Sequence, residues 1–123
     1  MITAGKSASA ETKVNETNTA RAVGSGSLDV FATPMMVALM EKAACEALAG
    51  SLEVGQTSVG TLVNVAHNAA TPLGATVTAT AEITAVNGRK VEFSVTASDG
   101  TKEIGNGTHS RFIVDETKFM AKL

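Results

Sequence analysis

Residues 75–98, ATVTATAEITAVNGRKVEFSVTAS, decide the fold because apolar and polar side chains alternate along both halves of this stretch. Alternation with a period of two buries one face of a strand and is typical of an antiparallel sheet with one face in water. Asn87-Gly88, between the two halves, predicts a type I′ hairpin turn, because both residue types tolerate a positive φ. The apolar positions that the pattern assigns to the buried face are Val77, Ala79, Ala81, Ile83, Val91, Phe93, Val95 and Ala97.

The flanking sequence extends this meander on both sides. Strands are expected over residues 58–66 and 102–114, and Asp99-Gly100 predicts a second hairpin turn. Residues 11–23 are rich in Thr and Val, which predicts an edge strand at the start of a single domain, residues 11–123. Residues 1–10 are small and polar without periodicity, and we expect a flexible N-terminal segment there.

One helix is predicted ahead of the strands, over residues 34–49. Thr33 is expected to cap its first turn through the side-chain hydroxyl, and Pro34 suits the first helical position. Gly50 suits a left-handed residue just after the last turn. A single helix before an antiparallel meander is an α+β layout in which the sheet can wrap the helix. The apolar face of the helix is expected to hold Met36, Val37, Met40, Ala43, Ala44, Ala47 and Leu48.

The composition favours a domain that shares apolar surface with a second subunit. Apolar residues make up 44% of the 123, but there are four Phe and no Tyr or Trp to supply large aromatic volume. A chain of this length buries only about two-thirds of its unfolded surface when it folds alone. A core built mainly from Val, Ala, Ile, Leu and Met is therefore thin, and a partner subunit would cover part of it.

Charge and cysteine content argue against several classes of protein. The net charge is −2 and the ten Lys and Arg residues are scattered, whereas nucleic-acid binders normally carry a basic patch. No apolar run approaches the ~18 residues that span a membrane, and residues 1–10 lack the apolar centre of a secretory signal. Cys45 stands alone and is expected to pack as a small residue, so we expect a cytoplasmic protein. Two His and one Cys leave little material for a metal site, no phosphate-binding Gly-rich motif occurs, and no cofactor is expected.

Three polar residues depart from the structural pattern. Glu41 lies at the margin of the apolar helix face, where a carboxylate has either a partner or access to water. His67 ends a predicted strand, and its ordinary pKa suits proton transfer near neutral pH, although a lone His is more often structural. Thr33 has a sufficient role as a helix cap, which is compatible with catalysis at the helix start.

Two residues of the predicted strands are further candidates for contact with a ligand. Gly60 lies inside a strand, where a glycine often marks the close approach of a ligand to the backbone. Gly105 and Gly107 allow the same interpretation or a β-bulge. Arg111 lies in an otherwise apolar strand and could pair with a phosphate or a carboxylate, or be exposed.

Several motifs together resemble the hotdog-fold thioesterases related to fluoroacetyl-CoA thioesterase, over about residues 12–122. The likeness begins with residues 31–41, FATPMMVALME, and continues through Val59-Gly60-Thr61 and residues 67–72, HNAATP. It is completed by residues 103–111, EIGNGTHSR, and by the tail KFMAK at residues 118–122. Each piece alone is weak evidence, but their order and spacing are specific.

The resemblance implies a hotdog fold, in which a long helix is wrapped by a curved antiparallel sheet. It also implies a homodimer that joins its sheets edge to edge, which could assemble further into a dimer of dimers, with active sites at the subunit interface. The catalytic Thr, Glu and His of the family correspond to Thr33, Glu41 and His67, and its substrate-contacting residues correspond to Gly60 and Arg111.

One departure from the family bears on the substrate. The fluoroacetyl-specific enzyme carries a Phe-bearing lid before the helix, whereas residues 22–30 contain no Phe. We therefore expect a general short-acyl-CoA thioesterase, with Arg111 holding a phosphate of coenzyme A. The alternatives are a non-catalytic acyl-CoA-binding protein and another hotdog enzyme, such as an enoyl-CoA hydratase or dehydratase, because a fold does not determine a function.

Overall fold

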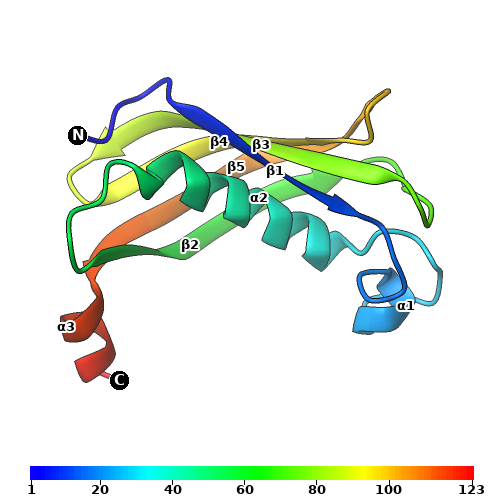
Figure 1. Cartoon of the computed structure of the whole chain (residues 1–123), viewed down its shortest axis with the longest axis horizontal. Coiled ribbons are helices and arrows are strands. Elements are labelled where there is room, and N and C mark those ends of the chain that lie inside the picture. The colour runs from blue at the N-terminus through cyan, green and yellow to red at the C-terminus, as the bar shows by residue number, and fades with distance from the viewer.

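A computed structural model describes all residues from 1 to 123, and its α+β architecture confirms the expected class. Five antiparallel strands form one sheet in the order β1-β3-β4-β5-β2, and this sheet curls around one long helix, α2 (Figure 1). The elements in chain order are β1 (Ser7–Lys13), α1 (Ala20–Val23), α2 (Thr33–Ala49), β2 (Gln56–His67), β3 (Thr76–Asn87), β4 (Lys90–Ser98), β5 (Glu103–Asp115) and α3 (Glu116–Ala121).

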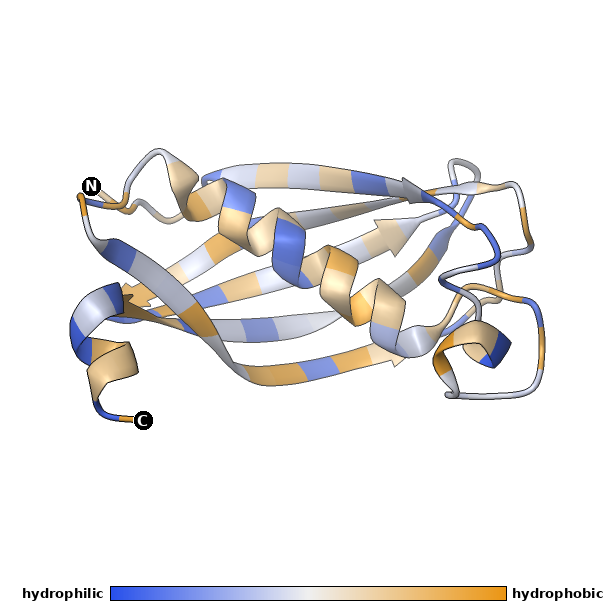
Figure 2. Ribbon diagram, turned by 60° about the horizontal axis from the view of Figure 1, so that its bottom comes forward, coloured by the Kyte–Doolittle hydropathy of each residue, from blue (hydrophilic) through white to orange (hydrophobic).

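The core lies between α2 and the concave face of the sheet. All eight apolar positions predicted for β3 and β4 are buried, and the intervening residues are half-buried or exposed. Figure 2 shows the same alternation as changes of hydropathy along the strands, with hydrophilic bands on the side of α2 that faces away from the sheet. On α2 the buried residues are Met36, Leu39, Met40, Ala43, Ala44, Ala47 and Leu48, so the predicted face is confirmed except that Val37 is only half-buried.

Both ends of α2 differ from the sequence-based expectation. Ala32 occupies the cap position and makes no side-chain hydrogen bond, while Thr33 is already helical. The prediction that Thr33 caps the helix is therefore wrong, because its hydroxyl forms a hydrogen bond with a residue elsewhere in the fold instead. Gly50 ends the helix as expected but has a φ of −79°, so it is not left-handed.

The N-terminal strand is shorter and begins earlier than predicted. β1 starts at Ser7, within the segment expected to be flexible, and pairs with β3 through Lys13. The expected strand over residues 11–23 stops there, since the chain turns and forms the single-turn helix α1. Thr19 caps that helix by accepting a hydrogen bond from the amide of Ala22.

Both hairpin turns occur where they are predicted, but neither has the expected type I′ geometry. Gly88 has a φ of 63°, but no residue other than glycine has a positive φ, which excludes a type I′ turn. At the second turn the Asp99 carboxylate accepts hydrogen bonds from the amides of Thr101 and Lys102. These bonds lower the pKa of Asp99 well below its usual value.

The strand β2 forms a long edge of the sheet with an apolar surface. Leu62 and Val63 expose 51% and 43% of their surface. A register shift against β5 between Gly60 and Leu62 leaves Thr61 as a bulge.

The expected bulge lies beside Gly105, because the pairing of β5 with β4 shifts between Ala97 and Ser98 and leaves Ile104 without a partner on β4. At Gly107 the pairing is regular, and an added Cβ would lie too close to the backbone of Asn64 and Val65.

Two smaller features complete the description. Cys45 is exposed on α2, so its predicted role as a packing residue is wrong. None of the helices is both long and apolar enough to cross a membrane.

Candidate active site

The start of α2 and the end of β2 meet in a polar pair. The hydroxyl oxygen Oγ1 of Thr33 lies 2.7 Å from Nδ1 of His67. In the tautomer that carries its proton on Nε2, the hydroxyl donates to Nδ1, which is the relation of a nucleophile to a general base. The hydroxyl expected to cap the helix is instead bound to a residue 34 positions away.

The Thr33–His67 pair opens onto a cavity of about 240 Å³. Backbone bonds from the amides of Asn68 and Ala69 to the carbonyl of Ile104 hold the loop that follows β2. The other wall is the segment that leads into α2, where the amide of Phe31 donates to the carbonyl of Thr71. The cavity lining consists of Ala20, Ser25, Val30, Phe31, Thr33, His67, Asn68, Ala69 and Ala70. A space of this size with a small-residue lining suits a short acyl group.

The environment of His67 favours the neutral imidazole. Burial lowers the pKa of His67 below its usual 6.5, and the backbone of Ala69 opposes this only in part. The second ring nitrogen, Nε2, is buried and makes no hydrogen bond within normal limits. His67 is therefore unprotonated and able to accept a proton at neutral pH.

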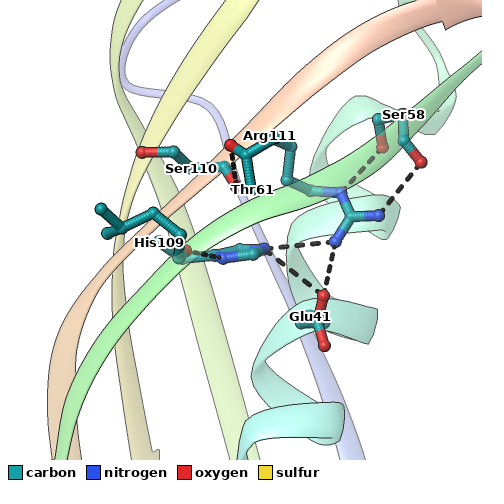
Figure 3. Close-up of polar contacts among 7 residues, drawn as sticks. Glu41, Ser58, Thr61, His109, Ser110 and Arg111 are labelled. Carbon is teal, nitrogen blue, oxygen red and sulfur yellow. Dashed lines mark hydrogen bonds and ion pairs between the residues drawn. The ribbon is translucent and has the colours of Figure 1, made fainter.

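Glu41 lies in a second polar cluster, formed with side chains of β2 and β5 (Figure 3). Its Oε2 accepts a hydrogen bond of 3.0 Å from Nη1 of Arg111, whose side chain is 8% exposed against 38% for Glu41. The Arg111 Nε donates to the hydroxyl of Ser58, and its Nη2 donates to the Ser58 carbonyl. Of the options open for Arg111, the structure shows a carboxylate partner, so its expected role as a phosphate ligand gains no support.

A buried histidine completes this cluster. His109 is 1% exposed, and its Nδ1 donates to the carbonyl of Leu62 at 2.7 Å. Its Nε2 accepts from Nη1 of Arg111 at 3.2 Å and lies 4.0 Å from Oε2 of Glu41. Burial, with the nearby Arg111 charge, lowers the pKa of His109, against the opposing effects of the Leu62 carbonyl and Glu41.

Gly60 leaves the space that the Glu41 carboxylate occupies. A Cβ added at Gly60 would lie 2.6 Å from Oε2 of Glu41, closer than real Cβ contacts, and 3.3 Å from Nη1 of Arg111. Gly60 was expected to mark the close approach of a ligand. Within the chain the approaching group is the Glu41 carboxylate, and contact of Gly60 with a ligand stays a prediction.

The five predicted site residues thus form two groups. Thr33 and His67 are joined at one end of α2, while Glu41, Gly60 and Arg111 are joined two turns further along the helix. Eight residues of helix separate Thr33 from Glu41, a rise of about 12 Å. Within one chain the structure does not bring Glu41 to His67, and their convergence at a subunit interface stays a prediction.

Ser58 and His109 were not among the predicted site residues. The available signal was the polar run Thr108-His109-Ser110-Arg111, because residues 109–111 are all buried in β5. Consecutive buried polar residues need hydrogen-bond partners, and an arginine two positions from a histidine lies on the same face of a strand.

Comparison with known sequences agrees with this geometry. Residues 14–117 match the family described as "FlK: Fluoroacetyl-CoA-specific thioesterase". A relative from Streptantibioticus cattleyicolor, fluoroacetyl-CoA thioesterase, is 52% identical over 95 residues, which are 77% of this chain and 68% of the relative.

Solved structures extend the match to nearly the whole chain. A crystal structure of a variant of the fluoroacetyl-CoA-specific thioesterase FlK superposes with a TM-score of 0.93 at 41% identity, covering 99% of this chain and 95% of that one. Another FlK variant, in complex with fluoroacetate and CoA, gives a TM-score of 0.89, also at 41% identity, covering 95% and 98% of the two chains. A thioesterase superfamily member from Thermus thermophilus gives 0.91 at 30% identity, covering 99% and 90%. The chain is a thioester hydrolase that acts on small acyl-CoA substrates, and it belongs to the family of fluoroacetyl-CoA-specific thioesterases.

Proposed function

We propose that the substrate is a two-carbon acyl-CoA, that fluoroacetyl-CoA is accepted, and that fluorine is not strongly preferred over hydrogen. The observation that carries this proposal is the 2.7 Å contact between Thr33 and His67 beside a small cavity. The segment before α2 supports the lack of fluorine selectivity. Phe31, the one Phe in this region, is buried in the core and forms part of the cavity wall, and residues 22–30 supply no Phe that could cover the cavity as a lid.

In the proposed reaction His67 first accepts a proton from the attacking group and then donates it to the leaving group. Either the Thr33 hydroxyl or a water bound to it attacks the thioester carbonyl, giving up its proton to Nδ1 of His67. The carbon–sulfur bond then breaks, and the same proton passes to the departing CoA thiolate. With Thr33 as nucleophile, water hydrolyses the resulting ester in a second, equivalent step. A backbone amide at the start of α2, or one near Gly60 of a second subunit, would stabilise the negatively charged oxygen of the intermediate.

We further propose that the active unit is a homodimer formed along β2. A strand of 12 residues with exposed Leu62 and Val63 at a sheet edge is a template for pairing with another chain. Pairing with a second copy would cover this apolar edge, as expected for a domain with a thin core that shares apolar surface with a partner subunit. It would also supply a route for Glu41 of one chain to join Thr33 and His67 of the other.

Thiol release tests the enzymatic proposal. Purified protein is incubated with fluoroacetyl-, acetyl-, propionyl- and butyryl-CoA while free thiol is followed with a colorimetric reagent. We expect turnover of the first two at rates within about tenfold of each other, and loss of at least about 100-fold in kcat for Thr33→Ala and His67→Ala. Val54→Ala, at a fully exposed loop position, is the matched control and should retain activity. Binding of acyl-CoA without thiol release, or equal rates for His67→Ala and the unaltered protein, would refute the proposal.

The oligomeric state tests the dimer. Leu62→Lys places a charge on the exposed edge of β2, and Val54→Lys makes the same change of charge away from it. Light scattering coupled to size-exclusion chromatography should show a dimer for Val54→Lys and a monomer for Leu62→Lys. A monomer for the unaltered protein at assay concentration, with full activity, contradicts the proposed dimer while leaving the thioesterase activity intact.

A further inference from the structure

His109 links three elements around the Glu41 carboxylate. It lies on β5, its ring stacks on Phe93 of β4 with centroids 5.8 Å apart, and it donates to the backbone of β2 at Leu62. Through Arg111 it reaches Glu41 on α2. Leu62 is the residue at which β2 resumes its pairing after the bulge next to Gly60. The ring is therefore restrained on its face and at both nitrogens.

The hydrogen bonds of His109 define its tautomer. A carbonyl oxygen can only accept, so the contact with Leu62 requires a proton on Nδ1. A guanidinium can only donate, so the contact with Arg111 requires a lone pair on Nε2. The neutral ring with its proton on Nδ1 satisfies both contacts, whereas a protonated ring would present a second cation to Arg111.

Arg111 in turn has little freedom. It makes four hydrogen bonds, to Ser58, Glu41 and His109, and the residue is 7% exposed. The same Nη1 atom bonds to both Glu41 and His109. Removing the acceptor on His109 would release Nη1 from one of its two anchors and leave Glu41 as the only acceptor for this nitrogen.

We propose that His109 is a positioning residue of the thioesterase reaction, which holds Arg111 in the orientation that directs the Glu41 carboxylate. This inference rests on the proposed participation of Glu41 in catalysis. His109 does not touch the Thr33–His67 cavity, and its effect reaches the substrate only through Arg111 and Glu41. The ionisable groups that face His109 are Arg111 on its own strand and Glu41 on α2. β2 and β4 present only the Leu62 carbonyl and the Phe93 ring.

Three neutral substitutions separate the two hydrogen bonds of the ring. His109→Phe keeps the stacking on Phe93 and removes both nitrogens. His109→Gln places an amide oxygen near the position of Nε2, so it retains an acceptor for Arg111. His109→Asn places an amide nitrogen near the position of Nδ1, so it retains the donor to Leu62 but does not reach Arg111. Val95→Ala, a buried position on β4 outside the cluster, is the control for general loss of stability.

The expected result is a fall in kcat without a matching change in KM. Loss of an interaction that orients a catalytic group commonly costs about 10–100-fold in activity, and we expect this range for His109→Phe and His109→Asn, with KM within about threefold. His109→Gln should recover to within about fivefold of the unaltered kcat. Val95→Ala should keep its kcat while its Tm falls.

The tautomer gives a readout that does not depend on turnover. The chain contains two histidines, so long-range ¹⁵N NMR spectra of the unaltered protein and of His67→Gln assign both rings. His109 should show a proton on Nδ1 at pH 7. If His109→Phe and His109→Gln lose activity equally, if kcat falls in step with Tm as in Val95→Ala, or if His109 carries its proton on Nε2, the positioning role is refuted. A protein that hydrolyses no acyl-CoA but shows the expected tautomer would instead refute the proposed function.

Discussion

Gly60→Ala tests the most specific contact of the candidate site. The added Cβ would lie 2.6 Å from Oε2 of Glu41, and ordinary van der Waals contact begins near 3.4 Å, so the carboxylate oxygen must retreat by about 0.8 Å. The same Cβ would also lie 3.3 Å from Nη1 of Arg111 and 3.4 Å from Cε1 of His109, so it meets all three members of the cluster. The substitution therefore displaces the carboxylate without removing any polar group.

A displacement of this size should affect the reaction far more than the fold. Misplacement of a reacting group by ~1 Å can cost about 100-fold in rate, which corresponds to about 2.7 kcal/mol in the barrier. The free energy of unfolding should change by no more than about 1 kcal/mol, since Glu41 is partly exposed and alanine restricts the unfolded chain more than glycine.

The assay is kcat/KM for thiol release together with urea denaturation of the same preparation. Gly50→Ala is the matched control, because its added Cβ would meet only the tip of Lys6 at 3.4 Å and its φ is −79°. We expect unchanged activity for this control. Activity of Gly60→Ala within threefold of the unaltered protein would show that the position of the Glu41 carboxylate does not limit the reaction.

Three further predictions follow from the polar contacts. Activity should rise with pH through an apparent pKa below 6.5 and level off at neutral pH, because His67 must be unprotonated and burial lowers its pKa; a pH–kcat profile with its midpoint above 7 contradicts this. Stability should fall as the pH drops below 6.5, because burial lowers the pKa of both histidines and the unfolded chain then binds more protons than the folded one. Thermal unfolding between pH 7.5 and 5 measures this. The dependence of Tm on pH should be weaker in a variant that carries His67→Gln and His109→Gln. Arg111→Gln should cost about 2 kcal/mol in urea denaturation, because it leaves buried partners unsatisfied, whereas Arg21→Gln breaks an exposed ion pair with Asp29 and should cost about 0.5 kcal/mol or less; equal losses would show that burial of Arg111 adds nothing.

The strands were predictable because their signal is local. Alternation in residues 75–98 identifies both the strands and the buried face, and the hairpin residues mark their ends within two positions. β1 was misplaced because the alternation in residues 7–13, SASAETK, involves only small and polar side chains and gives a weak hydropathy signal. The edge strand forms through pairing with β3, about 70 positions away in the sequence.

The sequence predicts most residues of the candidate site, but it does not predict how they are arranged. A helical wheel places Glu41 at the margin of the apolar face, and its half-buried position agrees, yet the wheel cannot reveal Arg111 as its partner. Thr33 was misassigned as a cap because local propensity favours that role, while a histidine 34 residues away provides the actual partner. His109 was missed because its hydrogen bonds depend on the register between β2 and β5, which a single strand pattern does not specify.

The surroundings of the His67 ring leave Nδ1 as the one ring nitrogen that can exchange a proton with a group in the cavity. Nε2 is enclosed and makes no hydrogen bond, while Nδ1 faces Thr33 and the cavity. In the proposed reaction a proton taken up at Nδ1 can return only through Nδ1, so acceptance from the attacking group and delivery to the departing sulfur occur at the same point. The proposed reaction therefore requires the substrate to present its carbonyl carbon and its sulfur to the same side of the ring, and a thioester bound in the reverse direction would leave its sulfur without a proton.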